Sequence, residues 1–360
     1  MERPVNVYHV IPKPEGGGAE RLVRELVKRL PDHGIHARGI YFYNPKRVPL
    51  AENEQCFDLP KRESSLAIPA LVRLFRSFDE SGHHIVHTHL THPLYYSLVG
   101  GVGRHAHLFF TEHNTFNRRR SSRIFRPIER AAYRLCKRVV CISDATDEAL
   151  REWLRDPSVE PAIRVINNGS RLFSNAGFRS VPPEGLDLVS IGALRPQKGF
   201  EYGIDAVARV RDLVRRYRIV GEGPELEKLK RLRDSHGLQD KVEFLGWSDR
   251  IKELLQQAHV QLIPSRWEGF GLVAVEGMST GIRVIASSVP GLKEIVGESS
   301  GGMLVEPHDP DAIASAIETI NHELVQGLDR SGEAAGRAGL FSIEQMVDNY
   351  ASLYRDFVAN

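Results

Sequence analysis

Two cationic side chains lie in a loop directly after an apolar run in the second half of the chain. Arg195 and Lys198 are three residues apart and follow Leu186–Ile191, which reads as a buried strand. A diphosphate leaving group carries about two negative charges, which an arginine and a lysine can neutralise together. Two solvated cations on a surface loop would give the same local pattern.

A second segment, residues 264–277, combines carboxylates with glycines. A predicted strand ends at Pro264, a glycine-rich loop follows, and a helix is expected to open near Gly271. Glu268 lies in the loop and Glu276 about one turn into the helix. Carboxylates at these positions could accept paired hydrogen bonds from sugar hydroxyls, close to a phosphate held at the helix N-terminus. For Glu276 alone, an ordinary helix-surface carboxylate is the competing interpretation.

A run of glycines follows the first predicted strand, Val5–Ile11, and opens a helix. Gly17 and Gly18 would let the backbone approach an anion at the helix N-terminus. This signal is weak alone, since a flexible strand–helix turn would look the same. It is not the dinucleotide-binding fingerprint, because Arg21 occupies the third glycine position.

The elements that must position these residues alternate between short β-rich runs and amphipathic helical patterns, which predicts parallel sheets covered by helices on both faces. Helices are expected over residues 20–30, 204–214 and 341–357. A chain of 360 residues favours two domains. We place them at residues 1–178 and 179–340, with residues 341–360 as a C-terminal helix packing back on the first domain. The predicted strands are residues 5–11, 84–88, 107–111, 138–142, 164–166, 186–191, 217–220, 242–244, 260–263 and 283–286.

Taken in order, these motifs resemble retaining glycosyltransferase family 4, which has the GT-B fold. Glu268 and Glu276 match the E-x7-E signature of that family, within PSRWEGFGLVAVEGMSTGIRVIASSVPGLKEIV. Further matching elements are Gly17, Gly18 and Glu20; Arg195 and Lys198; GEGPE at 221–225; and FLGW at 244–247. The resemblance covers nearly the whole chain. It implies an α/β fold of two Rossmann-like, doubly wound parallel-sheet domains facing a deep cleft.

The resemblance also implies a role for each matching residue. Glu276 would bind the donor ribose, Glu268 the transferred sugar, and Arg195 and Lys198 the diphosphate. His113, after a strand of the first domain, would contact the sugar near the reacting carbon; a capping or core histidine is the alternative. The catalytic set is therefore His113, Arg195, Lys198 and Glu268. The donor-binding set is Gly17, Gly18, Arg195, Lys198, Gly246, Glu268, Gly269, Phe270, Gly271, Leu272 and Glu276.

The implied reaction is a front-face displacement that transfers a sugar from a nucleotide-diphosphate donor, with UDP favoured and GDP possible, to a glycan or lipid-linked acceptor. No cofactor and no obligatory metal is expected for a reaction of this kind. A nucleotide-sugar-binding protein without transfer, or an epimerase of the same fold, stays open. Two positions depart from the family pattern: Asn168-Gly169 is followed by Ser170-Arg171, and His259 replaces the usual Asp.

A basic segment lies at residues 116–138, including Arg118 to Arg138, with nine Lys and Arg and one acid. Its apolar residues recur at helical spacing: Ile124, Phe125, Ile128, Ala132 and Leu135. Two interpretations stay open. The segment docks on anionic lipid, or it is a solvated face whose apolar side packs on the domain core. Nucleic-acid binding is not expected, because aromatic residues are not interleaved and no recognised module is present.

Eleven of the fifteen histidines fall within residues 1–113. His87 and His89 would share one face of a strand, so a metal site is conceivable. No carboxylate or cysteine spacing completes it, and histidines beside a cleft for polar sugars are the simpler account.

Composition fits a cytoplasmic enzyme, and a peripheral location on the inner face of the cytoplasmic membrane stays open. Three scattered cysteines fit a reducing setting, and neither a signal peptide nor a membrane-spanning run is expected. Residues 1–180 carry 28 Lys and Arg against 19 Asp and Glu, whereas the remainder carries 20 against 27. The first half is therefore expected to face something anionic.

Overall fold

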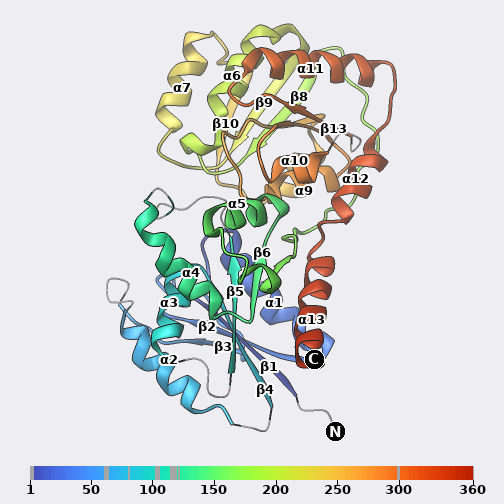
Figure 1. Cartoon of the computed structure of the whole chain (residues 1–360). Coiled ribbons are helices and arrows are strands. Elements are labelled where there is room, and N and C mark those ends of the chain that lie inside the picture. The colour runs from blue at the N-terminus through green and yellow to red at the C-terminus, as the bar shows by residue number, and fades with distance from the viewer. Residues whose placement is uncertain are drawn as a thin grey trace. The chain divides into compact units, whose positions relative to one another are not determined.

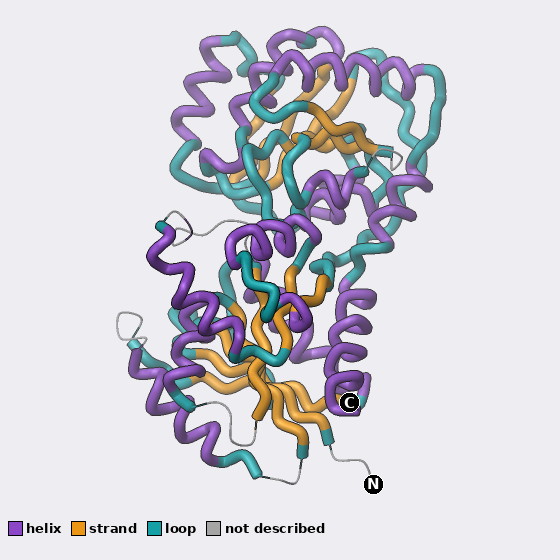
Figure 2. Tube along the Cα trace, viewed as in Figure 1, coloured by secondary structure: helices purple, strands orange, loops and turns teal. Residues whose placement is uncertain are grey.

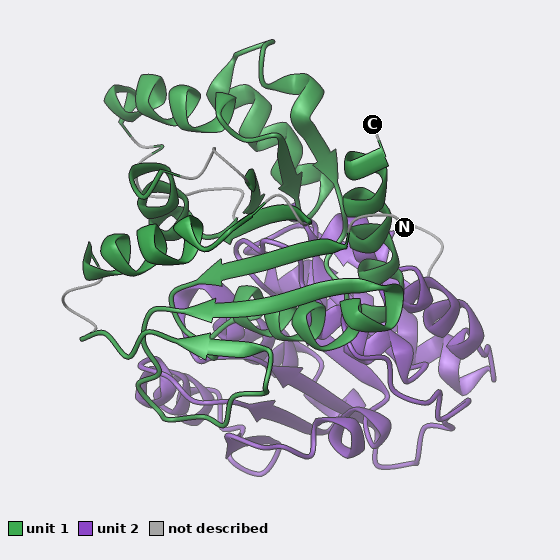
Figure 3. Ribbon diagram, turned by 90° about the horizontal axis from the view of Figure 1, so that it is seen from below, with its two compact units in different colours: residues 1–169, 343–360 green, residues 170–342 purple. Residues whose placement is uncertain are grey.

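The computed structural model describes residues 4–60, 65–79, 82–101, 106–113, 120, 122–297 and 301–359. The chain forms two compact units, shown in separate colours in Figure 3. Unit 1 comprises Met1–Gly169 together with Ile343–Asn360, and unit 2 comprises Ser170–Ser342. The sequence pattern put the divisions at residues 178 and 340 instead. No helix among the described residues is both long and apolar enough to cross a bilayer.

Unit 1 is built on a seven-stranded parallel sheet in the order β3-β2-β1-β4-β5-β6-β7. The order reverses between β1 and β4, which makes this a doubly wound sheet with its topological switch at that point. The strands, drawn as the orange bands of the lower half of Figure 2, are β1 (Val5–Ile11), β2 (Ile35–Tyr41), β3 (Glu54–Cys56), β4 (His83–His89), β5 (Ala106–Glu112), β6 (Arg138–Cys141) and β7 (Ile163–Val165).

Helices cover both faces of this sheet, because strand residues alternate between two apolar cores. Tyr8 and Val10 belong to the core formed with α2 (Ala67–Arg76), α3 (Thr91–Val99), α4 (Arg126–Arg134) and α5 (Asp144–Leu154). Val7 and Ile11 face the opposite core, formed with α1 (Gly18–Arg29) and α13 (Ile343–Ala359). Figure 1 shows α13 beside this sheet although it comes last in the chain. The closing helix is therefore a structural part of unit 1.

Unit 2 repeats the plan with six parallel strands in the order β10-β9-β8-β11-β12-β13, and its switch lies between β8 and β11. Leu188 and Tyr217 face the core shared with α6 and α11, whereas Val189 and Val220 face Leu255 of α8. The strands are β8 (Leu186–Ile191), β9 (Val214–Val220), β10 (Val242–Gly246), β11 (Val260–Ile263), β12 (Arg283–Ser287) and β13 (Gly302–Val305). The helices are α6 (Phe200–Arg209), α7 (Leu226–Ser235), α8 (Ile251–Gln256), α9 (Leu272–Ser279), α10 (Leu292–Val296), α11 (Pro310–Val325) and α12 (Ser331–Gly339).

The predicted fold class of two doubly wound parallel-sheet α/β units is confirmed. The helix predicted over residues 204–214 is wrong in its second half. α6 ends at Arg209, a 3-10 turn covers Arg211–Leu213, and β9 begins at Val214. The apolar spacing continued past the helix because both elements bury residues in the same core. Residues 332–339, a glycine-rich run directly before the last predicted helix, form most of helix α12.

Candidate functional site

The loops that follow β8 and β11 are joined to each other at the carboxyl edge of the unit 2 sheet. These strands are neighbours, and the Arg266 N–H donates to the Gln197 carbonyl oxygen at 2.8 Å. The Gln197 side chain donates in turn to the Trp267 carbonyl oxygen at 3.1 Å. Gly199 makes the approach possible, because its φ is 60° and a Cβ there would lie 2.1 Å from the Pro264 carbonyl oxygen. The two charged motifs of the sequence therefore occupy one site.

The centre of this site is an ion pair between Lys198 and Glu268. The Lys198 ammonium contacts Glu268 Oε1, and their side chains are 20% and 8% exposed. The Ser265 hydroxyl donates to the same carboxylate oxygen at 3.1 Å. Arg195 lies at the start of the 3-10 turn Pro196–Lys198 and is exposed. The site thus combines a lysine whose charge is balanced by Glu268 with an arginine that faces solvent.

Helix α9 opens directly behind Glu268. Gly271 precedes its first residue, Leu272, with a φ of 89°, and Glu276 follows about one turn later with a half-buried side chain. Gly269 is half-buried, whereas Phe270 is buried, with its ring centroid 5.7 Å from that of Phe341. The E-x7-E spacing therefore places one carboxylate in the loop and one on the helix that begins there.

The loops after β9 and β10 join the same edge. The Gly221 N–H donates to the Gly246 carbonyl oxygen at 2.8 Å, and the Gly192 N–H donates to the Val220 carbonyl oxygen at 2.9 Å. A Cβ on Gly221 would lie 1.9 Å from the Gly192 carbonyl oxygen, so only glycine fits this crossing. Gly246, which is predicted to contact the donor, therefore lies at the same edge of the sheet as Lys198, with the loop after β9 between them.

In unit 1 the predicted glycine turn lies between β1 and α1. Gly17 is the N-cap of α1 and Gly18 its first residue, and both are exposed. The buried Glu20 side chain accepts a hydrogen bond from the Gly17 N–H at 2.8 Å. Glu20 therefore caps the helix and already satisfies one of its free amide groups.

His113 follows β5 and is buried beside a cluster of histidines that the sequence only partly indicated. Its Nε2 lies 3.2 Å from Nδ1 of His89, whose Nε2 lies 3.0 Å from Nδ1 of His9. Burial lowers the pKa of both His9 and His113 to about 3, so each ring is neutral at physiological pH. His9 was not predicted, because its place opposite His87 depends on the pairing of β1 with β4.

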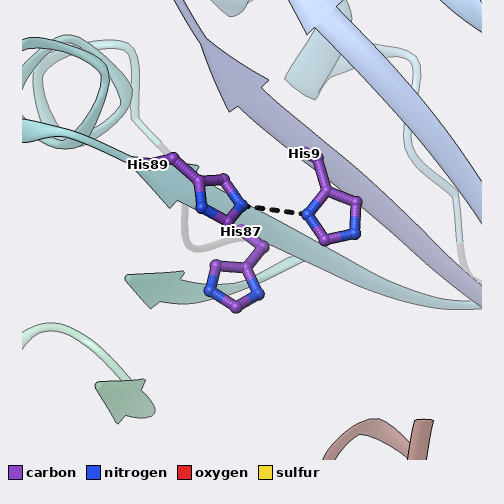
Figure 4. Close-up of side chains that lie close together, drawn as sticks. All are labelled: His9, His87 and His89. Carbon is purple, nitrogen blue, oxygen red and sulfur yellow. Dashed lines mark hydrogen bonds between the residues drawn. The ribbon is translucent and has the colours of Figure 1, made fainter. Parts of the chain in front are cut away.

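His9, His87 and His89 each offer a nitrogen within 4.8 Å of the others, the arrangement that a metal site would require (Figure 4). The two nitrogens of His87, however, already contact the Tyr354 hydroxyl at 2.6 Å and the Thr111 hydroxyl at 2.8 Å. The donor set fits a metal by residue type. Both nitrogens of His87 and of His89, and Nδ1 of His9, are engaged in hydrogen bonds, whereas the buried Nε2 of His9 has no partner among the described residues.

The basic segment is only partly described, since residues 116–119 and 121 lie outside the described residues, Arg118 among them. Arg120 is no surface cation: its side chain is 5% exposed and contacts Glu112 at 2.6 Å. Ala132 packs in the core, as the solvated-face interpretation expects. The other apolar residues of the predicted stripe are exposed: Ile124, Phe125, Ile128 and Leu135.

The two departures from the family pattern have structural roles. His259 Nδ1 accepts a hydrogen bond from the Asp187 N–H at 3.0 Å, and its Nε2 lies 3.2 Å from the Ser180 carbonyl oxygen. Asp187 and His259 stand at the amino-terminal ends of β8 and β11, away from the charged edge. Ser170 is buried and donates its N–H to the Phe341 carbonyl oxygen at 2.9 Å.

Comparison with known proteins assigns both units. Residues 16–171 match the model of "Glycosyltransferase Family 4", and residues 178–332 match that of "Glycosyl transferases group 1". The chain is 27% identical to an uncharacterized glycosyltransferase of Methanocaldococcus jannaschii over 94% of this chain and 95% of that protein.

A second relative has a described activity. The chain is 26% identical to the UDP-Gal:alpha-D-GlcNAc-diphosphoundecaprenol alpha-1,3-galactosyltransferase of Escherichia coli, over 99% of this chain and 98% of that protein. Among solved structures, HepE of Anabaena in complex with UDP superposes with a TM-score of 0.80 at 19% identity, over 98% of this chain and all of that one. The two family models together span most of the chain, which therefore belongs to the family 4 glycosyltransferases of the GT-B type.

Proposed function

We propose that this glycosyltransferase transfers a sugar with retention of anomeric configuration from a nucleotide-diphosphate sugar, with a UDP-sugar favoured, to a glycan or lipid-linked acceptor. The proposal rests on Arg195, Lys198 and Glu268, which lie at the carboxyl ends of the neighbouring strands β8 and β11, where the strand order of the sheet reverses. Ligands of open α/β sheets bind at such a switch point. The UDP-sugar named for the Escherichia coli relative supports the choice of donor.

In the proposed reaction the diphosphate of the donor competes with Glu268 for the Lys198 ammonium. Arg195, which is exposed, supplies a second cation, so charge that develops on the leaving phosphate is stabilised as the glycosidic bond breaks. Glu268 is released toward hydroxyls of the transferred sugar, and Glu276 accepts from the ribose diol. The acceptor attacks from the face that the diphosphate leaves, and the diphosphate takes the acceptor proton. The roles of His113, Gly17 and Gly18 as sugar and phosphate contacts stay predictions.

The donor is tested by thermal shift with UDP, GDP, ADP and their common sugar conjugates, in EDTA. A ligand that binds only the folded protein raises its apparent stability by mass action. We expect a shift with UDP conjugates that is clearly smaller in Glu276→Ala and unchanged in Glu253→Ala on α8. A shift confined to GDP conjugates would change the donor, and no shift with any of them would overturn the donor site.

A nucleotide-sugar-binding protein and an epimerase are separated from a transferase by the product. With the donor identified, NMR of the reaction with an acceptor mixture should show a new glycosidic linkage with the anomeric configuration of the donor. An inverted anomer would contradict retention. Donor that is bound but unchanged, or isomerised without acceptor, would favour one of the two alternatives. Full activity in EDTA is expected if no metal is required.

We further propose that the 3-10 turn Arg123–Phe125 and the start of α4 dock on an anionic membrane that holds the acceptor. Ile124 is 73% exposed and Ile128 55% exposed, so these apolar side chains are not packed on the core. The same turn is crowded with cations: desolvation, followed by the guanidinium groups of Arg155, Arg130 and Arg123, lowers the pKa of Arg126. Exposed apolar residues among basic ones are typical of helices that lie in the interface of anionic lipid.

A further inference from the structure

Three buried histidines of unit 1, His9, His89 and His113, form a row that ends at His113. β4 supplies His87 and His89 on one face, and the register sets His9 of β1 opposite His87 and Thr111 of β5 opposite His89. His113 continues that face two residues beyond Thr111. The sheet therefore brings three imidazoles from three neighbouring strands into one row, with nitrogen–nitrogen distances of 3.0 and 3.2 Å. Figure 4 shows the first of these contacts as the dashed line between His9 and His89.

Such a row has only two self-consistent states. A neutral imidazole carries one N–H donor and one acceptor nitrogen. Since His89 contacts a neighbour through each of its nitrogens, it donates to one and accepts from the other. All hydrogens in the row therefore point toward His113 or all point toward His9. The tautomer of His113 cannot change unless those of His89 and His9 change with it.

The rings are kept neutral and fixed by their surroundings. His9, His89 and His87 are fully buried, and desolvation is the main cause that lowers the pKa of each. His87 stacks on His89 with ring centroids 4.7 Å apart, but its own nitrogens bond Tyr354 and Thr111 instead of the row. Leu90, directly after His89, has a φ of 67°, a strained conformation for leucine that turns the chain sharply into α3.

We propose that His9 and His89 are positioning residues that hold His113 in one tautomer, so that its Nδ1 meets the donor sugar with one fixed hydrogen-bonding sense. Nε2 of His113 is used in the row, which makes Nδ1 the nitrogen of that ring that can serve a ligand. The inference rests on the proposed function for its consequence in catalysis, but the row itself is a property of the folded chain. A metal ion at His9, His87 and His89 is the competing account, since it would consume the lone pairs that the row needs.

The first test uses the unaltered protein. With ¹⁵N-labelled histidine, NMR should show neutral His9, His89 and His113, each as a single tautomer, with ¹⁵N–¹⁵N couplings across both hydrogen bonds. Absence of these couplings would overturn the inference. A stoichiometric transition metal in the purified protein, measured by elemental analysis, would overturn it in favour of a metal site.

The second test replaces His9, at the end of the row opposite His113. His9→Phe keeps a ring of similar size and does not touch His113, so we expect His113 to populate both tautomers and kcat to fall about tenfold or more, with donor KM changed less than about twofold. His87→Phe is the matched control: it alters an equally buried neighbour and leaves the row intact. A single His113 tautomer and unchanged kcat in His9→Phe would contradict the proposal. If the unaltered protein shows no sugar transfer, the proposed function is contradicted, but the NMR result on the row still stands.

Discussion

At the carboxyl edge of the unit 2 sheet an ion pair lies beside an exposed arginine, whereas the row of histidines in unit 1 consists of neutral rings. Lys198 and Glu268 retain some exposure, and Arg195 faces solvent. His9 and His89 are sealed in the core, where a charge would be strongly disfavoured, so they take part only as hydrogen-bonding groups. Two units with one fold plan therefore differ in the chemistry of this edge.

The difference indicates a division of labour. Paired ions at a partly exposed edge suit a ligand that brings charge of its own, because it can exchange partners without leaving a buried charge unpaired. Neutral groups with fixed donors and acceptors suit a ligand with hydroxyl groups, where direction matters more than charge. Under the proposed function, we therefore expect unit 2 to bind the phosphates and the histidines of unit 1 to orient the sugar.

The largest effect is expected at the charged edge. Under the proposed function, Lys198→Ala should lower kcat by about 10²-fold or more, because the leaving diphosphate loses one electrostatic stabiliser. The measurement is turnover at saturating donor. Lys241→Ala is the control, since its ammonium bonds the Val214 carbonyl oxygen at the opposite end of the strands. Near-normal turnover of Lys198→Ala would remove the charged edge from the reaction.

A smaller effect is expected from Glu276→Ala. Loss of a carboxylate that accepts hydrogen bonds from the ribose should weaken UDP binding by about tenfold or more. Isothermal titration with UDP measures this, and kcat at saturating donor should change much less, because the bond is made equally in the bound and transition states. If Glu276→Ala binds UDP normally, the nucleotide lies elsewhere on unit 2.

The neutral edge predicts a dependence of stability on pH. The lowered pKa of His87 means that the unfolded chain binds a proton near pH 6.5 that the folded chain does not. Stability is therefore full above pH 6.5 and falls as the pH drops below it, by about 1.4 kcal/mol per buried histidine between pH 7.5 and 5.5. Urea unfolding of His87→Phe should show a pH-dependent loss about 1.4 kcal/mol smaller than that of the unaltered protein. An equal loss in both would mean that the ring is not held neutral by the fold.

The smallest effect concerns the surface of α4. Ile124→Ser combined with Ile128→Ser should weaken sedimentation with anionic vesicles roughly fivefold, because less apolar area enters the lipid interface. Val325→Ser with Leu340→Ser, two exposed apolar residues of unit 2, is the matched control. Equal sedimentation of both variants would leave the segment as a solvated face.

Prediction of strands from the sequence was best for well-buried strands. β8 and β11 were predicted to the residue, and they are buried along almost their whole length. β2, β3 and β13 were missed: β2 alternates with exposed His36 and Arg38, β3 has three residues of which none is buried, and β13 is only partly buried. A partly exposed strand lacks the apolar run of a strand buried on both faces, so its pattern resembles that of a loop.

The candidate site, too, was predicted only in part from the sequence. Glycines and charges identified two loops in the sequence, one with Arg195 and Lys198 and the other with Glu268. The contact between these loops depends on β8 and β11 being neighbours, which the local sequence pattern does not encode. The histidine row needs the register of three strands: His89 and His113 were predicted separately, from different motifs, and His9 was not predicted. Arg120 was misjudged as a surface cation because its partner, Glu112, lies on β5.

The placement of α13 has a consequence for how the protein is made. Unit 1 is assembled from residues 1–169 and 343–360, and its core includes Tyr350 and Tyr354. On the ribosome the first of these segments emerges early but lacks its last helix until all of unit 2 has been synthesised. Domains usually mature in the order of their synthesis. Here the order is reversed: the unit translated first is completed last, and its apolar sheet face must wait through the synthesis of the whole second unit before α13 covers it.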